Sequence, residues 1–357
     1  MTSTTWSGFE EYSRIAAAFG PPGMEGGVRK VMGALLQPYA RAVETDRMGN
    51  LYAVMGPDHG PIVMLGAHMD EVALVVSAVT ESGFLRVMPQ GLLRARDFVL
   101  QPVSVLARDG PVQGIADVAR QGGEYAISDI LVDVGARSAK GVGELGILPG
   151  DRVCFAPGTR ALGPEVIIGK AADDRVGLYV LAAVARELAR ADLSAKVVLV
   201  CTVQEEGVDT FVAWGGAQVA ANRLDPALFL GIDTVESCDH DNGPGSPAHS
   251  RIGLADGVGI LRGAQDLHPG LVDHLLSRAR SRGLRHQIVP LAATAADYTR
   301  VSRARQGVPC AGLAIPIRHP HSGSEMFLWR TVEDAIELIL GVLGEPQELL
   351  RIGAELH

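Results

Sequence analysis

The segment KVVLVCTVQEE, residues 196–206, constrains the fold more than any other stretch of this chain. Its first half is a run of β-branched and aliphatic residues, too short to cross a membrane and typical of a strand buried on both faces. The run ends in two adjacent carboxylates, Glu205 and Glu206. Charges at the carboxyl end of a buried parallel strand lie where open α/β sheets form clefts, so the pair needs a metal ion, another cation or a proton. Taken alone, two glutamates after a strand are more often a solvated turn or the first turn of a helix.

The length of 357 residues exceeds that of a typical single core, so we expect two domains or one domain with a large insertion. Hydrophobic residues make up 47% of the chain and charged residues 20%, which is the composition of a globular protein. The net charge of −9 and the absence of a Lys/Arg cluster argue against nucleic acid and anionic membranes as partners. An excess of carboxylates does suit the binding of cations.

The sequence shows no targeting pattern. Residues 1–14 have neither a basic leader nor an apolar segment, and no apolar run approaches the ~20 residues that cross a bilayer, so we expect no signal peptide and no membrane span. The four cysteines are far apart and form no Cys-x-x-Cys pair, and they are Cys154, Cys201, Cys238 and Cys310. This usage favours free thiols in a reducing compartment, so we expect a cytoplasmic protein.

The texture of the sequence changes over residues 72–164. Short β-like runs are separated there by glycine and proline, and helical spacing is nearly absent apart from residues 139–145. The pattern predicts a small β barrel or sandwich inserted between two parts of an α/β domain, residues 1–71 and 165–357. The expected fold class is a mixed, largely parallel sheet flanked by helices, with a β-barrel-like insertion.

The order of elements around the opening segment indicates how the sheet is connected. A short strand at 167–169, an acidic turn, a helix at 176–191 and the strand at 196–202 follow one another. This succession predicts a βαβ unit with parallel strands in the main sheet. The polar segment 234–249 is expected to form a loop at the mouth of the cleft.

Acids and histidines follow the strands expected to end at this cleft, and they are His68 and Asp70, Asp173 and Asp174, Glu205 and Glu206, Asp233, and His319 and His321. Each residue alone has an ordinary explanation, such as a core histidine, a helix N-cap or a turn acid. Those explanations do not predict the recurrence of such residues at equivalent topological positions. Imidazole and carboxylate without thiolate form the ligand set of catalytic Zn²⁺ or Co²⁺ centres, and two ions need a carboxylate to bridge them.

Six ordered motifs resemble those of a known family, and they are AHMDEV at 67–72, KAADDRVG at 170–177, TVQEE at 202–206, GIDT at 231–234, GVP at 307–309 and IPIRHPHS at 315–322. Together with GPPGMEGGVRK at 20–30 and RMGNL at 47–51, they cover nearly the whole chain. In these motifs the sequence is similar to the M42 family of dinuclear metallo-aminopeptidases, which includes glutamyl and deblocking aminopeptidases.

The resemblance implies a metal site with two divalent ions, Zn²⁺ or Co²⁺. His68 and Asp233 would hold one ion, and Glu206 and His321 would hold the other. Asp173 would bridge the two ions.

The resemblance implies two further roles. Glu205 matches the general base of the family, which would take a proton from the attacking water and return it to the leaving amine. Asp70 lies two residues after His68 and would orient that imidazole, while Asp174 would support the bridging carboxylate. The activity implied is the removal of N-terminal residues from short peptides.

The inserted β domain resembles the dimerisation domain of the family. In relatives, its pairing leads to a hollow dodecamer that admits only peptides. The resemblance therefore implies a homo-oligomer built from dimers.

Two segments depart from the family pattern. After the two glutamates relatives usually continue Val-Gly-Leu-Arg-Gly, whereas residues 207–216 read GVDTFVAWGG. The usual Gly-Thr-Asp-Ala appears as TAADY at 294–298, with bulkier residues in place of glycine. Both changes bear on side-chain preference. His319 stands where tyrosine is common, and we expect it to have a structural or substrate-lining role before a ligand role.

Three alternatives remain open at this stage. The first is a di-metal amidohydrolase or deacylase that acts on N-acyl amino acids or other small amides. The second is a glycosidase that uses Glu205 and Glu206, which would leave the other acids and histidines without a role. The third is a non-catalytic binding protein, which the presence of the base and of all five ligand positions argues against.

Overall fold

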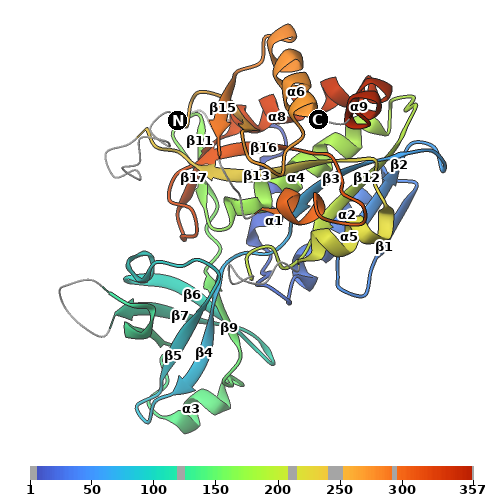
Figure 1. The fold of residues 1–357 in the computed structure, drawn as a ribbon. Coiled ribbons are helices and arrows are strands. Elements are labelled where there is room, and N and C mark those ends of the chain that lie inside the picture. The colour runs from blue at the N-terminus through green and yellow to red at the C-terminus, as the bar shows by residue number, and fades with distance from the viewer. Residues whose placement is uncertain (1–5, 119–124, 208–214, 240–251, 292–295, 356–357) are drawn as a thin grey trace.

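The structure is a computed structural model that describes residues 6–118, 125–207, 215–239, 252–291 and 296–355. The chain forms an α/β body and a β barrel that projects from it, and the barrel comes from the first half of the chain (Figure 1). This arrangement confirms the predicted fold class, a mixed and largely parallel sheet flanked by helices with a small inserted barrel.

The main sheet lies at the centre of the α/β body. In the described part of the chain it has eight strands, in the spatial order β1 (Ala42–Thr45), β2 (Leu51–Met55), β12 (Lys196–Thr202), β3 (Ile62–His68), β13 (Leu228–Glu236), β16 (Cys310–Ile317), β14 (Val258–Arg262) and β15 (His286–Pro290). Strands β12, β3, β13 and β16 run parallel, and the strands next to them on either side, β2 and β14, run antiparallel to them. Strand β12 is buried after its first residue, as expected for a strand covered on both faces.

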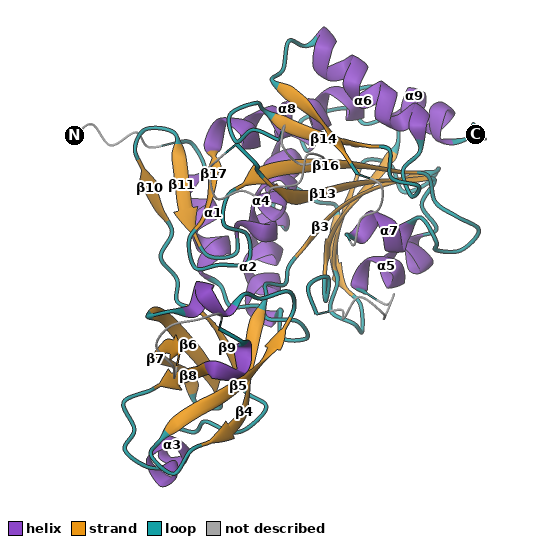
Figure 2. Cartoon of the chain, turned by 60° about the vertical axis from the view of Figure 1, so that its left-hand side comes forward, coloured by secondary structure: helices purple, strands orange, loops and turns teal. Residues whose placement is uncertain are grey.

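Helices cover both faces of this sheet (Figure 2). They are α1 (Phe9–Ala17), α2 (Gly26–Leu36), α4 (Ala172–Leu188), α5 (Gly216–Leu224), α6 (Pro269–Ser281), α7 (Asp297–Val301), α8 (Trp329–Leu343) and α9 (Pro346–Gly353). Helix α4 lies against β3 and β13 and packs with α1, α2 and α8 on one face, while α5 and α7 pack together on the other. Because α4 is enclosed by the sheet and by other helices, almost all of its residues are buried. Among the described residues, no helix combines the length and apolarity needed to span a membrane.

The strand predicted at 167–169 does not join the main sheet. It is β11 (Val166–Gly169), which pairs antiparallel with β10 (Arg160–Leu162) and β17 (Glu325–Leu328) in a separate sheet. The predicted βαβ unit is therefore wrong, and the parallel partner of β12 is β3. The prediction failed because the apolar pattern of so short a strand identifies a strand but not the strand with which it pairs.

The barrel closes in the order β4 (Ala73–Val79), β5 (Phe84–Gln90), β8 (Ile130–Asp133), β7 (Gly110–Val118), β6 (Gln101–Ala107) and β9 (Arg152–Phe155). The short helices η1 (Ala95–Phe98), η2 (Ile127–Asp129) and α3 (Ala139–Glu144) lie between its strands along the chain. Its apolar core is separate from the core around the main sheet. We propose on this basis the division into an α/β domain, residues 1–71 and 165–357, and an inserted domain, residues 72–164.

A buried ion cluster holds together the two chain segments that join the barrel to the body. Glu71 follows β3, and its carboxylate contacts Lys170 Nζ at 2.7 and 2.8 Å and Arg175 Nη2 at 3.0 Å. All three side chains are almost fully buried, where an unpaired charge would be costly. His68 lies three residues before Glu71, and Asp173 three residues after Lys170, so the cluster fixes the distance between two predicted metal ligands.

Replacement of Glu71 by alanine is expected to destabilise the folded protein strongly. The variant Glu71→Ala leaves two buried cations without their partner, which costs about 3–5 kcal/mol. Urea denaturation followed by fluorescence or circular dichroism measures this loss in the free energy of unfolding.

An exposed ion pair provides the matched control. Asp58 lies 2.6 Å from Arg41 on the surface, and Asp58→Ala should cost less than about 1 kcal/mol. The pH dependence of the free energy of unfolding gives a second readout. Burial raises the pKa of Glu71, but the charges of Lys170 and Arg175 outweigh burial and hold this pKa below its ordinary value. The contribution of Glu71 is therefore complete above its unfolded pKa and is lost as the pH falls through its folded pKa. Equal costs for the two substitutions would contradict the role of the cluster.

Candidate metal centre

The carboxyl ends of the parallel strands meet at one edge of the main sheet. Four predicted ligands come from these strands: His68 ends β3, Glu206 follows β12, Asp233 lies within β13, and His321 follows β16. The fifth, Asp173, lies in the first turn of α4, where its backbone and that of the next residue are not helical.

Asp173 lies between two groups of donor atoms. Its Oδ1 is 3.1 Å from His68 Nε2, which is 3.9 Å from Asp233 Oδ1. Its Oδ2 is 3.5 Å from His321 Nε2, which is 3.1 Å from Glu206 Oε1. Within each group, one donor atom from each residue lies within 4.8 Å of the others. The structure thus brings together all five predicted ligands, in the two groups that the resemblance implies, with Asp173 in both.

Both histidines turn the same ring nitrogen toward these groups. Nδ1 of His68 lies 3.1 Å from the backbone carbonyl of Asp70, and Nδ1 of His321 lies 2.7 Å from that of Leu92. A carbonyl only accepts, so each Nδ1 donates, and each Nε2 faces the acids and could bind a metal ion in place of a proton. Metal-binding histidines show this pattern, because their second nitrogen donates to a carbonyl or a carboxylate.

The inserted barrel domain also contacts the chain segments that carry predicted ligands. Leu92 belongs to the segment between β5 and η1, in which Arg94 donates to the carbonyl of Pro320 at 3.2 Å. In the same segment Gly91 has a φ of +93°, and a Cβ there would lie 3.1 Å from the carbonyl oxygen of Glu206. The inserted domain therefore contacts the segments that carry His321 and Glu206.

The carboxylate of Asp70 holds the two glutamates more closely than it holds His68. Its oxygens accept from the backbone N–H groups of Glu205 at 2.9 Å and Glu206 at 2.8 Å. Its Oδ1 lies 3.6 Å from His68 Nδ1, farther than the backbone carbonyl of the same residue. That the Asp70 carboxylate orients His68 stays a prediction.

Glu325 is a further residue of the site, outside the six sequence motifs. It is buried at the start of β17, where one oxygen accepts from the backbone N–H of Asp173 at 2.9 Å and the other from that of His321 at 2.8 Å. Glu325 therefore ties together the segments that carry two predicted ligands. The available signal was an acid directly before a short apolar strand, Glu325 before MFL. Asp174 makes a comparable contact, because it accepts from the backbone N–H of His68 at 3.3 Å.

The site concentrates negative charge in a buried place. Burial and the charge of Asp173 raise the pKa of Asp233 to about 8. Burial also raises the pKa of Glu205 well above its ordinary value, although His68 and Arg300 oppose this shift. Burial by itself lowers the pKa of His321, but the acids beside it raise the pKa to about 12. The protein's own charges thus favour the binding of positive charge here, as protons or as metal ions.

The residues present fit divalent metal ions. The two groups offer carboxylate oxygens and imidazole nitrogens without thiolate, which suits Zn²⁺ and Co²⁺. A buried cluster of this kind at the carboxyl edge of a largely parallel sheet is typical of metal-dependent hydrolases.

Glu205 belongs to neither donor group among the described residues. Its Oε1 accepts from Arg300 Nη1 at 2.9 Å. Arg300 is not predictable from the sequence, because an arginine in a short helix carries no sign of its partner. His319 also lies outside both groups.

Parts of the two segments that depart from the family pattern, residues 208–214 and 294–295, lie outside the described residues. Residues 240–249 of the predicted loop also lie outside them. The first residues of that predicted loop, 234–236, are not a loop but the end of strand β13.

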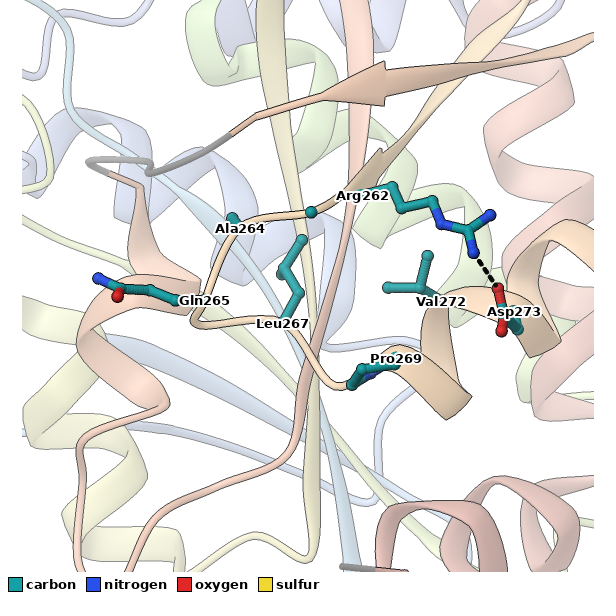
Figure 3. A pocket seen from close by; sticks show the side chains of 8 residues that line it. Arg262, Ala264, Gln265, Leu267, Pro269, Val272 and Asp273 are labelled. Carbon is teal, nitrogen blue, oxygen red and sulfur yellow. Dashed lines mark ion pairs between the residues drawn. The ribbon is translucent and has the colours of Figure 1, made fainter. Parts of the chain in front are cut away.

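A cavity of about 390 Å³ lies elsewhere on the body (Figure 3). It is formed by the turn after β14 and the start of α6, and it includes an ion pair of 3.3 Å between Arg262 and Asp273. Because β14 runs antiparallel to β16, Arg262 lies toward the start of β16, away from the predicted ligands. We therefore assign this cavity no part in the site.

Comparisons with known proteins agree with the fold. A family model described as M42 glutamyl aminopeptidase matches residues 49–338. The chain is 30% identical over 339 residues to the lysyl aminopeptidase of Pyrococcus furiosus, covering 91% of this chain and 94% of that protein. A solved aminopeptidase from the archaeon Desulfurococcus kamchatkensis matches with a TM-score of 0.89 at 27% identity, covering 98% of each chain. The TET1 peptidase of Pyrococcus horikoshii, described as able to assemble into a tetrahedron or a large octahedral shell, matches with a TM-score of 0.82 at 25% identity, covering 95% of this chain and 100% of that one.

The chain therefore belongs to the M42 glutamyl aminopeptidase family, and the resemblance seen in the sequence is confirmed. It is a hydrolase of peptide bonds, and the family match supports aminopeptidase activity. Peptidases of this family are metalloenzymes, in agreement with the two donor groups. The finding favours peptide hydrolysis over the glycosidase and the non-catalytic alternatives.

Divalent cations are expected to stabilise the metal-free protein. An ion that binds only the folded chain at 100 times its Kd adds about 2.7 kcal/mol of stability, which corresponds to a rise in Tm of roughly 4 °C. Thermal unfolding of chelator-treated protein with and without added Zn²⁺ or Co²⁺ measures the rise.

The control variants separate the site from general charge effects. Asp173→Asn removes the shared carboxylate and should lose most of the rise, whereas Asp58→Asn, an exposed acid, should keep it. A NaCl solution of equal ionic strength should give no comparable rise. The metal site would be contradicted by an equal rise in Asp173→Asn and in the wild type.

Proposed function

We propose that this aminopeptidase removes N-terminal residues from short peptides with two divalent ions, Zn²⁺ or Co²⁺, and with Glu205 as the general base. His68 and Asp233 would hold one ion, Glu206 and His321 the other, and Asp173 both. The observation that carries the proposal is the position of Asp173, whose two oxygens face imidazoles of two separate donor groups.

The surroundings of the two glutamates favour a ligand role for Glu206 and a proton-transfer role for Glu205. Glu206 lies in a donor group, beside His321. Glu205 lies in neither group, so its carboxylate is available to exchange protons. The bound ions would supply Lewis acidity and would lower the pKa of the attacking water. Glu205 would accept the proton of the attacking water and return it to the leaving amine.

The proposed ions support the preference for a chain end. A free N-terminus has an α-amine that offers a lone pair when it is neutral, and one of the two ions could hold it. An acylated N-terminus has no such amine. No observation on the described residues favours the deacylase alternative.

We also propose a homo-oligomer that forms through the barrel, in the cytoplasm. Most of the large apolar side chains exposed in the described part of the chain belong to the barrel, and they are Met88, Leu92, Leu100, Ile115, Leu145 and Leu148. Exposed apolar side chains of this kind mark sites of association. The assembly of the TET1 peptidase supports the same view. All four cysteines are free, as in proteins of a reducing compartment.

Replacement of Glu205 by glutamine should abolish turnover without loss of metal. The amide keeps the size of the side chain but cannot accept the proton, so kcat should fall by about 10²–10⁴-fold. A panel of aminoacyl-anilide substrates, assayed on stripped protein reloaded with Zn²⁺, Co²⁺ or Mn²⁺, measures kcat, and elemental analysis measures the metal.

Two controls accompany this variant. Glu81→Gln changes an exposed glutamate and should leave kcat unchanged. Acylated peptides should be cleaved far more slowly than peptides with a free N-terminus. Loss of metal together with activity in Glu205→Gln would show that Glu205 is a ligand, and faster cleavage of acylated substrates would favour the deacylase.

The intact chain should have a mass in solution that is a multiple of the subunit mass. Light scattering coupled to size exclusion measures it. A triple variant with lysine in place of Met88, Ile115 and Leu148 should lower the mass, because charge disfavours burial of the barrel surface. Val219→Lys, on the exposed face of α5, should not. A monomeric wild type at micromolar concentration would overturn the proposal.

A further inference from the structure

We propose that Arg300 is a positioning residue that holds the carboxylate of Glu205 in one orientation beside the two donor groups. This inference rests on the proposed function, because it gives Arg300 a role through the predicted base. Nothing in the motifs at 202–206 or 315–322 points to an arginine in this place.

Arg300 donates two hydrogen bonds to Glu205. Its Nη1 donates to Oε1 of the Glu205 side chain at 2.9 Å, and its Nη2 donates to the backbone carbonyl of Glu205 at 3.0 Å. A planar guanidinium that bonds the side chain and the main chain of one residue fixes both the position of the backbone and the rotamer. A lysine in its place could bond one of these oxygens but not hold both in the same plane.

Arg300 is itself held by a chain of contacts that returns to β12. Its Nη1 contacts Asp297 Oδ1 at 3.3 Å, one turn earlier in α7. The other oxygen of Asp297 accepts from the hydroxyl of Thr202 at 2.5 Å. Thr202 is the last residue of β12 and precedes Glu205 by three residues. The contacts Thr202–Asp297–Arg300–Glu205 therefore form a closed clamp that begins and ends on the same stretch of chain.

The surroundings of Arg300 fit this role better than a role in binding substrate. Its side chain is 8% exposed, and its guanidinium is already paired with Glu205 and Asp297. Gly215, before α5, leaves room for it, since a Cβ there would lie 3.1 Å from Arg300 Cδ. A substrate carboxylate would have to displace two buried acids to reach it. The clamp thus acts on Glu205 and not directly on the peptide.

Removal of Arg300 should lower kcat and leave the binding of substrate and metal nearly unchanged. A base displaced by ~1 Å loses about 100-fold in rate, so Arg300→Ala should reduce kcat by about that factor with KM within about threefold. Metal content should equal that of the wild type. Arg300→Lys should recover part of kcat, and guanidinium ion added at millimolar concentration should partly restore the alanine variant.

The matched control is Arg303→Ala. Arg303 lies three residues further along the chain, is 57% exposed and pairs with Asp266 away from the donor groups. Its removal should leave kcat and KM unchanged, and added guanidinium ion should not raise the kcat of this variant.

A second measurement uses the metal-free protein and no substrate. In a double-mutant cycle of Arg300→Ala and Glu205→Gln, the drop in Tm caused by the second substitution should be at most half of its drop in the wild-type background, because the two side chains share one hydrogen bond. Additive drops in Tm would overturn the clamp.

The kinetic outcomes are also decisive. A kcat of Arg300→Ala within threefold of the wild-type value would overturn the inference. A rise in KM confined to substrates with an N-terminal Asp or Glu would also overturn it, because Arg300 would then be a substrate contact. If Arg300→Ala does not fold, Arg300→Lys and Arg300→Gln carry the same tests. Full activity of Glu205→Gln would overturn the proposed function itself, whereas an inactive Glu205→Gln beside an active Arg300→Ala would overturn the clamp alone.

Discussion

The structure depends on holding several carboxylates close together in a place with little water. Asp173 is the centre of this arrangement, because it faces an imidazole on each side. Backbone N–H groups stabilise the acids around it: those of Glu205 and Glu206 donate to Asp70, and those of Asp173 and His321 donate to Glu325. These hydrogen bonds stabilise the negative charge of Asp70 and Glu325 and do not occupy the side of the cluster where a cation would bind. The parallel strands supply the geometry, and the neighbouring backbone keeps the acids in place.

The inserted barrel is coupled to this chemistry at two levels. Where the chain leaves and re-enters the body, Glu71 and Lys170 form a buried ion pair within three residues of His68 and Asp173. At the site itself, the carbonyl of Leu92 accepts from His321. The barrel is thus both a candidate surface for association and a part of the frame that orients a predicted ligand.

The sequence predicted those parts of the protein that local patterns encode. Strand β12 and its two glutamates could be found from an apolar run that ends in charge, and the same pattern located His68 and Asp233. Pairing was harder, and β11 was placed in the wrong sheet, because a strand of four residues does not specify its neighbour. Glu325 and Arg300 could not be foreseen, since their roles come from contacts across the fold with residues 152 and 95 positions away in the chain.

The acceptor that orients His321 belongs to the main chain of Leu92, a residue that is 70% exposed. A change of amino acid at this position alters the side chain and leaves the carbonyl where it is. The insertion or deletion of one residue in the tight segment from Gly91 to Arg94 would instead carry that carbonyl away. The bond to His321 therefore restricts the length of this connection, whereas the side chain of residue 92 is restricted only by what it contacts at the surface of the barrel.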